Sequence, residues 1–499
     1  MTVPSIVDQA IRHADRIAVV TADVSTTYSQ LVQRSAAVAS ALLDGTSDLQ
    51  EARIAYLVPA GADYVSTQWG VWRAGGVAVP LSASATDREL EYTLTDSQSS
   101  VVVTDQTTAG RLQELCDRLK IRLLVLEDVG ELQVSLPNVT ADRAALMLYT
   151  SGTTSKPKGV VTTHRCIQAQ IESLVTAWQW QPDDRIPLFL PLHHIHGIIN
   201  IMSCALWTGA TIETFSRFDA DSILQRIRTD AYTLFMAVPT IYVRLIELLE
   251  AMPASERQET VAAIGRLRLM VSGSAALPAS VHESWTQLTR QHLLERYGMT
   301  EIGMALANPL DGQRRPGTVG QPLPGVEVRL ISESRDVVTD ENVPGEIQVR
   351  GETVFREYWN RPEATAASFQ DGWFCTGDIA VLEDGYYRIM GRSSVDIIKS
   401  GGYKLSALEI EASLLDHPSI AACAVVGMPD DTWGEAVSAA IVLKPGNALT
   451  LEELRTWCKD RISPYRIPRA LRTVDDLPRN AMGKVTKPAV TELFREAGN

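Results

Sequence analysis

The sequence predicts an α/β protein with a large N-terminal domain and a small α+β C-terminal domain. Apolar strand segments alternate with helical patterns, which favours parallel-rich sheets flanked by helices. From about residue 326, strand segments lie among Pro/Gly turns, which indicates a β-rich subdomain. A compact tail with its own pattern follows Gly391-Arg392. We therefore expect one domain at 1–391 and a second at 392–499.

The first part of the chain carries the alternation most clearly. Strands are predicted at 53–58, 100–104 and 122–126, with helices between them at 62–74 and 108–119. The strand series continues at residues 144–149, 185–190, 211–215 and 267–271.

The later part of the chain has a different arrangement of predicted elements. The β-rich subdomain is expected to contain strands at 326–331 and 345–350. In the tail we expect a helix at 407–415, strands at 421–426 and 436–443, and a helix at 451–461.

Composition narrows the class of protein. A net charge of −14 argues against a general nucleic-acid-binding surface, although a local patch can still bind an anionic substrate. The cysteines form no CxxC pair and no cluster with histidine, which suits a reducing compartment without structural zinc. The first residues lack the pattern of a signal peptide, and no uninterrupted run of about 18 apolar residues predicts a membrane span. We expect a cytoplasmic protein.

The segment 150–159, TSGTTSKPKG, is the most informative motif. It follows the apolar run 144–149, so small hydroxylated residues and glycines end a predicted buried strand. Their N–H groups and hydroxyls can bind phosphate, and Lys156 and Lys158 add positive charge. A Walker A pattern does not fit these residues. The alternative is a surface loop rich in Thr and Ser.

Further motifs follow in a fixed order. They are PLHHIHG (191–197), VSGSAALP (271–278), YGMTE (297–301), GWFCTGD (372–378), GR (391–392), KSGGYK (399–404) and PRNAMGK (478–484). The ordered set resembles the adenylate-forming superfamily of acyl-CoA synthetases, peptide-synthetase adenylation domains and beetle luciferases. LPLHHIHG, FMAVPTIY, LMVSGSAALP and LERYGMTEIGMAL are most similar to malonyl- and methylmalonyl-CoA synthetases.

The resemblance implies a two-step ligase that uses ATP, Mg²⁺ and CoA. A carboxylate is joined to AMP with release of pyrophosphate, and the acyl group then passes to CoA. Because two anions meet in the first step, electrostatic stabilisation is expected to make the main contribution to catalysis. The resemblance also implies a mobile C-terminal domain that carries the catalytic lysine and turns about a pivot within 392–396.

The resemblance assigns the nucleotide site residue by residue. The phosphate-binding residues are Thr150, Ser151, Gly152, Thr153, Thr154, Lys158 and Thr300. The adenine and ribose are assigned to Tyr297, Gly298, Gly273, Ser274, Ala275, Asp378 and Arg392. The chain departs from the family at Ser155, where Gly is usual. An Asp that only forms a turn is the alternative for Asp378.

Two residues are assigned to the chemistry of adenylation. Glu301 matches the carboxylate that binds Mg²⁺, which needs hard oxygen ligands. Lys484 matches the lysine that enters the site and neutralises charge between the carboxylate and the α-phosphate. A solvated acid at a helix start and an exposed lysine are the ordinary alternatives.

The acid-binding residues are expected to be His194, Arg296 and Ser272. The resemblance implies that Arg296 lies at the edge of the acid pocket and that the matching His and Arg of malonyl-CoA synthetases hold a distal carboxylate. An unpaired buried Arg is unfavourable, so we expect a substrate with a second carboxylate, malonate first and methylmalonate second. The alternative is that Arg296 pairs with a protein acid such as Glu295 or Asp311 and leaves an aliphatic pocket. For His194 the alternative is a gate or a core histidine with its hydrogen bonds satisfied, and His193 and His196 are expected to serve packing or the tunnel.

Gly401, Gly402 and Tyr403 match the segment beside the pantetheine tunnel, although a plain glycine turn has the same pattern. Other functions remain open at this point. The chain could activate short- or medium-chain or aryl monocarboxylates, or load an acyl-carrier protein in trans. A nucleotide-binding module without activity is disfavoured because Lys484, Glu301 and Asp378 occur together. No nucleic acid is expected as a partner.

Overall fold

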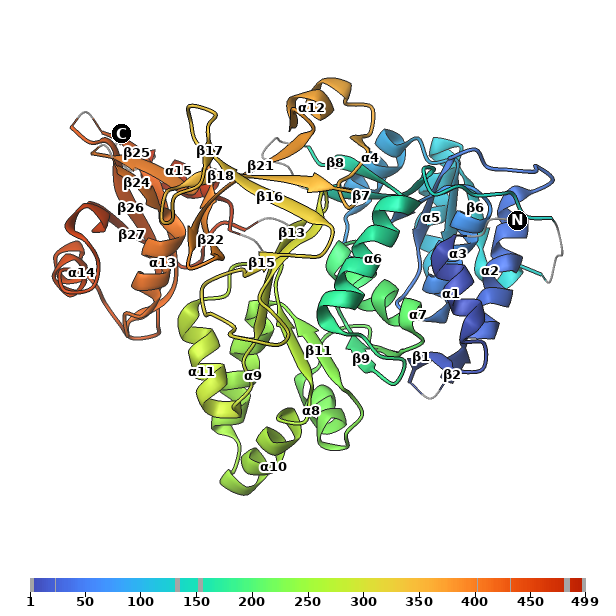
Figure 1. The fold of residues 1–499 in the computed structure, drawn as a ribbon, viewed down its shortest axis with the longest axis horizontal. Helices are drawn as coiled ribbons and strands as arrows, with labels where there is room; N and C mark the ends of the chain where they lie inside the picture. Colours follow the sequence, from blue (N-terminus) through green and yellow to red (C-terminus); the bar gives the residue numbers. More distant parts are fainter. Residues whose placement is uncertain are drawn as a thin grey trace.

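The computed structural model describes residues 4–22, 24–130, 135–150, 156–401, 403–430, 432–479 and 485–495. Six residues with predicted roles lie outside these ranges, namely Ser151, Gly152, Thr153, Thr154, Gly402 and Lys484. Within the described residues the strands form five sheets. Figure 1 shows the C-terminal part, drawn in orange to red, at one side of the larger N-terminal body.

The first sheet has seven strands and holds both ends of the phosphate-binding motif. Its order is β19 (Glu357–Tyr358), β8 (Lys158–Thr163), β7 (Ala144–Thr150), β4 (Val77–Pro80), β3 (Arg53–Leu57), β5 (Val101–Thr104) and β6 (Arg122–Val125). The strands from β7 to β6 run parallel, whereas β8 and β19 add antiparallel strands at one edge. Its helices are α3 (Ala62–Arg73), α4 (Asp87–Ser97) and α5 (Gln106–Leu119), with a 3₁₀ turn η1 (Leu126–Asp128).

The second sheet has the order β2 (Val24–Thr27), β1 (Ile17–Thr21), β10 (Thr211–Thr214) and β9 (Arg185–Leu188). The elements packed near it are α1 (Ser5–Arg12), α2 (Tyr28–Leu43), α6 (His164–Trp178), the π-helix η2 (His196–Ser203) and α7 (Cys204–Thr208). Trp178 in α6 is fully buried, and this sheet shares one large hydrophobic core with part of the first sheet.

The third sheet supplies most of the candidate site. Its order is β11 (Leu234–Ala237), β12 (Leu269–Ser272), β13 (Leu294–Met299), β14 (Gly303–Ala307) and β15 (Gln321–Pro322). The neighbouring helices are α8 (Ala220–Arg228), α9 (Pro239–Ala251), α10 (Ala254–Ile264) and α11 (Ala279–Thr289), which lie in the lower lobe of Figure 1. β11 to β13 are parallel, so the motifs that follow β12 and β13 meet at one edge of the sheet.

The β-rich subdomain is a six-stranded antiparallel sheet. It contains β17 (Val337–Val338), β16 (Val326–Ile331), β18 (Gly345–Gly351), β21 (Trp373–Glu383), β20 (Phe369–Gln370) and β22 (Tyr386–Arg392), with α12 (Pro362–Ala367) beside it. β22 ends at the residue where the C-terminal domain is predicted to begin.

The C-terminal part has its own sheet and separate small hydrophobic cores. Its strands are β24 (Tyr403–Ser406), β23 (Ile397–Ser400), β26 (Gly434–Leu443), β25 (Ile420–Asp430) and β27 (Ala470–Thr473). Its helices are α13 (Ala407–Leu415), α14 (Leu451–Cys458), η3 (Pro464–Arg466) and α15 (Lys487–Arg495).

The predicted α/β fold with a large and a small domain is confirmed, and the differences lie at element ends. β25 runs on to Asp430 because it pairs with β26 along its whole length, through Gly427 and Pro429. α14 ends at Cys458, earlier than the predicted 461. Among the described residues, no helix is long and apolar enough to cross a bilayer.

Candidate active site

Three residues assigned to adenine and ribose form a direct chain of contacts. The Tyr297 hydroxyl donates to Asp378 Oδ2 at 2.5 Å, and Arg392 Nε lies 3.1 Å from Asp378 Oδ1. Asp378 and Arg392 are also opposite each other in the β21–β22 ladder. Burial raises the pKa of Asp378, while the Arg392 guanidinium and the Tyr297 hydroxyl oppose that rise. The carboxylate is therefore fixed before any nucleotide binds.

Glu301 lies in the turn between β13 and β14, beside the predicted phosphate-contacting Thr300. The carboxylate is buried, and its Oε1 accepts a hydrogen bond from the Tyr358 hydroxyl at 2.9 Å. Lys158 Nζ lies over the Tyr358 ring, 4.8 Å from its centre. Burial raises the pKa of Glu301, and Tyr358, Arg392 and Lys158 lower it.

The strands around the phosphate-binding motif hold its two ends together. Thr150 and Lys158 are opposite residues in the antiparallel β7–β8 ladder. On the other side of β8, Tyr358 of β19 pairs with Val160. Because the Tyr358 hydroxyl also donates to Glu301, the strand that carries Lys158 is linked to Glu301 through Tyr358. The ladder therefore places the motif's ends beside the predicted Mg²⁺ carboxylate.

Gly298 occupies an irregular position of β13 where only glycine fits. A methyl group there would lie 2.1 Å from the carbonyl oxygen of Gly303. The ladder between β13 and β14 shifts its register between Tyr297 and Gly298. This shift sets the geometry of the turn that carries Thr300 and Glu301.

Arg296 on β13 is 5% exposed and has no carboxylate partner among the residues that the structure describes. Its Nη2 donates a long hydrogen bond, 3.4 Å, to Ser274 Oγ, while its Nε is buried without a hydrogen-bond partner. Burial lowers the pKa of Arg296 to about 9. A methyl group at Gly273 would lie 2.5 Å from Arg296 Cζ, so the predicted adenine wall (Gly273, Ser274 and Ala275) adjoins the guanidinium.

The two protein acids that could have neutralised Arg296 have other partners. Glu295 is the preceding residue of the strand, so its side chain points to the opposite face, where it accepts from the Gly317 N–H at 3.2 Å. Burial raises the pKa of Glu295 to about 8. Asp311 accepts from Gln179 Nε2 at 2.8 Å. In the described part of the chain, the structure supports neither acid as the partner of Arg296.

Other buried polar groups lie close to Arg296. His196 Nδ1 is 3.0 Å from Ser274 Oγ, the atom that Arg296 also contacts, and His196 Nε2 is buried without a partner in the described residues. The Ser272 hydroxyl, at the end of β12, is also buried and unpartnered within those residues. Burial, reinforced by Arg296 and His194, lowers the pKa of His196 well below its ordinary value, so the imidazole is neutral. Ser274 itself has a φ of +71°, a strained conformation for a residue with a side chain.

His194 lies in the same motif as His193 and His196, and its ring contacts a neighbouring histidine. Its ring lies against that of His193, with centres 4.2 Å apart, and burial lowers the pKa of His193 to about 4. The hydrogen bond to Ser274 belongs to His196, for which the sequence suggested packing or the tunnel. Whether His194 binds the acid stays a prediction.

Gly401 and Tyr403, the two predicted CoA-binding residues that the structure describes, border the C-terminal sheet. Gly401 has a φ of +57°, and a methyl group there would lie 2.8 Å from the Trp433 ring. The Tyr403 ring is half exposed and stacks on Tyr465 with centres 4.4 Å apart. Glycine at 401 is therefore needed for close packing as well as for its backbone angle.

The residues around Glu301 are compatible with Mg²⁺. The described residues contain no group of three or more His, Cys, Asp or Glu that could hold a metal. An ion at this place would depend on the Glu301 carboxylate together with nucleotide oxygens and water, which is how Mg²⁺ is commonly bound beside phosphates.

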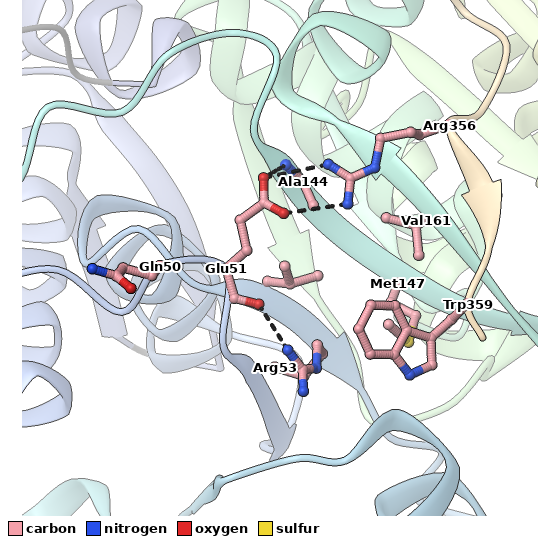
Figure 2. Close-up of a pocket in the computed structure, with 9 residues that line it drawn as sticks. Gln50, Glu51, Arg53, Ala144, Met147, Val161, Arg356 and Trp359 are labelled. Atoms are coloured by element: carbon pink, nitrogen blue, oxygen red, sulfur yellow. Dashed lines mark hydrogen bonds and ion pairs between the residues drawn. The ribbon is translucent and has the colours of Figure 1, made fainter.

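A separate cavity of about 140 Å³ lies near the edge of the first sheet. Figure 2 shows its charged lining: the Glu51 carboxylate accepts hydrogen bonds from Arg356 and from the Ala144 N–H. Arg53 lies over the Trp359 ring, 4.5 Å from its centre. Trp359 packs in the smaller core of this sheet, whereas its neighbour Tyr358 packs in the large core and contacts Glu301. The cavity therefore lies on the face of the sheet away from the candidate site.

Sequence reasoning missed Tyr358 and the His196–Ser274 contact. Tyr358 is separated from Glu301 by 57 positions, and His196 from Ser274 by 78. No local pattern marks Tyr358. A signal for His196 did exist, because it stands beside His193 and His194 in a motif already singled out.

Comparison with known proteins finds two matching family models and several similar proteins. A model described as AMP-binding enzyme matches residues 6–359, and one described as AMP-binding enzyme C-terminal domain matches 409–484. The Mus musculus protein described as malonate–CoA ligase ACSF3, mitochondrial, is 44% identical over 98% of this chain and 90% of its own length. The Arabidopsis thaliana malonate–CoA ligase is 40% identical over 96% of this chain and 86% of its own length. The crystal structure of ATP-bound MatB from Rhodopseudomonas palustris has a TM-score of 0.90 and 31% identity, with 100% of both chains covered.

The comparison corrects one prediction. The mouse relative and three further vertebrate relatives are described as mitochondrial, so the expected cytoplasmic location is wrong. The physical reason is that net charge and cysteine usage do not distinguish one reducing compartment from another. An acyl-carrier protein as acceptor gains no support, because the mouse and Arabidopsis relatives are both described as CoA ligases.

Proposed function

Because the chain belongs to the AMP-binding enzyme family, we propose that it is an acid–thiol ligase that joins malonate to CoA. One malonate carboxylate attacks the α-phosphorus of ATP, which forms malonyl-adenylate and releases pyrophosphate. The CoA thiol then attacks the acyl carbon, which forms the thioester and releases AMP. Methylmalonate is the second substrate, since one added methyl group changes binding by only about 1–3 kcal/mol.

The observation that carries the proposal is the buried Arg296, which has no carboxylate partner in the part of the chain that the structure describes. A buried guanidinium without a carboxylate is unfavourable, and malonate offers a second carboxylate of matching geometry. The unpartnered His196 Nε2 and Ser272 hydroxyl can contribute further hydrogen bonds to it. Their nearness to the predicted adenine wall supports a far carboxylate that lies beside the nucleotide, where the near carboxylate has to react.

The remaining roles follow from the cluster around Asp378 and Glu301. Tyr297, Asp378 and Arg392 would hold adenine and ribose, and Thr150, Thr300 and Lys158 would contact phosphates. Mg²⁺ on Glu301 would neutralise charge on the phosphate oxygens. Lys484 would supply the positive charge between the reacting carboxylate and the α-phosphate.

The test is a substrate panel in which AMP release is measured with ATP, CoA and single acids. Malonate and methylmalonate should give the highest kcat/KM, and propionate, butyrate and benzoate should be poor substrates. Propionate is the matched control, because it replaces the second carboxylate of malonate by a methyl group. A higher kcat/KM with a monocarboxylate would contradict the proposal, and adenylate formation without transfer to CoA would favour another acceptor.

A further inference from the structure

A cluster of buried charges lies in the C-terminal part, outside the acid and nucleotide sites. Lys487, the first residue of α15, forms an ion pair with Glu411 of α13, and its Nζ lies 3.6 Å from Asp396 Oδ1. The same ammonium donates to the Val425 carbonyl of β25 at 2.6 Å. The three charged side chains are only 11 to 14% exposed. One lysine therefore joins three elements of the C-terminal part.

Asp396 extends this cluster to the last strand of the N-terminal part. Its Oδ2 accepts from the Arg392 N–H at 3.0 Å, and its own N–H donates to the Arg392 carbonyl at 2.8 Å. A methyl group at Gly391 would lie 2.4 Å from Asp396 Cβ, so the two segments are in close contact. Arg392 in turn contacts Asp378. A continuous series of contacts thus runs from Lys487 to the predicted ribose carboxylate.

Lys487 also lies directly beyond the base of the segment that contains Lys484. Arg479 and Val485, which flank residues 480–484, form an antiparallel bridge. The Thr486 N–H donates to the Pro478 carbonyl at 2.9 Å. Lys484 is three positions before Lys487, so their Cα atoms are at most about 11 Å apart. Whatever fixes Lys487 therefore fixes one end of this short segment.

We propose that Lys487 is a positioning residue for adenylation: its contacts with Glu411 and Asp396 fix the start of α15, three positions after Lys484, relative to the nucleotide-binding strand β22. The inference rests on the proposed function, in which Lys484 acts in the first half-reaction only. Lys487 does not touch the substrate. It acts through the base of the segment and through Asp396.

Lys487→Met tests the inference, because it removes the ammonium and keeps much of the apolar stem. Adenylation is measured as malonate-dependent exchange of pyrophosphate into ATP, and transfer as thioester formation from supplied malonyl-adenylate and CoA. Adenylation should fall by about 100-fold, the size expected when a reacting group is misplaced by about 1 Å. Thioester formation should keep most of its rate, and Lys484→Ala provides the reference for a full adenylation defect.

Two further variants separate positioning from folding. Val490→Ala removes buried contacts of the same helix, α15, without touching the charge cluster, and it should affect both half-reactions alike. Glu411→Gln keeps an oxygen acceptor for Lys487 but removes one charge, so it should weaken adenylation selectively and less than Lys487→Met does. If Lys487→Met fails to fold, Glu411→Gln still tests the inference.

Equal losses in the two half-reactions for Lys487→Met or Glu411→Gln would overturn the inference. A selective adenylation loss in Val490→Ala would do the same, because any disturbance of α15 would then suffice. Failure of the proposed function has a different result, since the wild-type protein would then show no malonate-dependent exchange at all.

Discussion

The nucleotide side and the acid side of the candidate site are both buried, yet their polar groups are arranged differently. Around Asp378 and Glu301, hydroxyls and cations of the protein contact the carboxylates. Around Arg296, buried polar atoms have a long hydrogen bond or no partner among the described residues. The nucleotide side is therefore organised by the protein alone, whereas the acid side depends on its ligand for full pairing.

This difference separates two kinds of specificity. A site whose groups are already paired loses activity for all acids when one group is removed. A site with an unpaired buried cation distinguishes between acids, because only a matching substrate offsets the desolvation of that cation. Substitutions on the two sides should therefore have different signatures.

The largest effect is expected on the nucleotide side with Glu301→Gln. The variant keeps the shape of the side chain and loses the charge that Mg²⁺ requires, so adenylation should fall by about 100- to 1,000-fold. Pyrophosphate exchange measured with malonate and with propionate should decrease by the same factor. A loss confined to malonate would contradict the assignment of Glu301 to the nucleotide side.

His196→Leu should have a smaller and selective effect on the acid side. A hydrogen bond to a charged group contributes about 1.5–3 kcal/mol, which corresponds to a loss of about 10- to 100-fold in kcat/KM for malonate. Propionate should be affected little, because it has no second carboxylate to accept the bond. Steady-state kinetics with both acids checks the contrast, and equal losses would reassign His196 to packing.

The pH dependence should also differ between the two acids. Arg296 has its pKa lowered to about 9, so in the free enzyme it is charged below that pH and loses its proton above it. The ratio of kcat/KM for malonate to that for propionate should be constant at neutral pH and decrease about tenfold per pH unit above 9. A ratio that stays constant up to about pH 10.5 would show that Arg296 keeps its proton over this range, which would contradict the lowered pKa.

The smallest effect concerns the stability of the unliganded protein. Arg296→Met removes a buried charge that has no carboxylate partner among the described residues, and it should raise Tm by about 2–4 °C. Asp378→Ala leaves the Tyr297 hydroxyl without its acceptor and should lower Tm by a similar amount. Thermal unfolding without ligands measures both. A lower Tm for Arg296→Met would indicate that the guanidinium is already well paired within the protein.

The sequence predicted the strand and helix order well, because apolar segments and turn residues are local signals. The predicted strand at 326–331 and helix at 407–415 match the observed elements. Among the described motif residues of the nucleotide side, Tyr297, Asp378 and Arg392 come into contact, although their strands belong to two sheets. The resemblance supplied their individual roles.

Other features depend on contacts that no local pattern records. Tyr358 contacts Glu301 only because β19 pairs with β8. The paired residues Glu357 and Val161 are nearly two hundred positions apart in the chain. The π-helix η2 brings His196 to Ser274, and a wide helical turn cannot be distinguished from an α-helix by apolar spacing. Lys487 carries no local signal, because Glu411 in α13 and Asp396, which contact it, are distant in the sequence.

The most direct measurement of the central claim is the ratio of kcat/KM for malonate to that for propionate in the wild-type protein and in Arg296→Met. Truncating one partner of a buried charge pair typically costs about 2–5 kcal/mol, so the ratio should fall by roughly 30-fold or more. An unchanged ratio would contradict the account, because the far carboxylate would then be recognised by some other group or not at all.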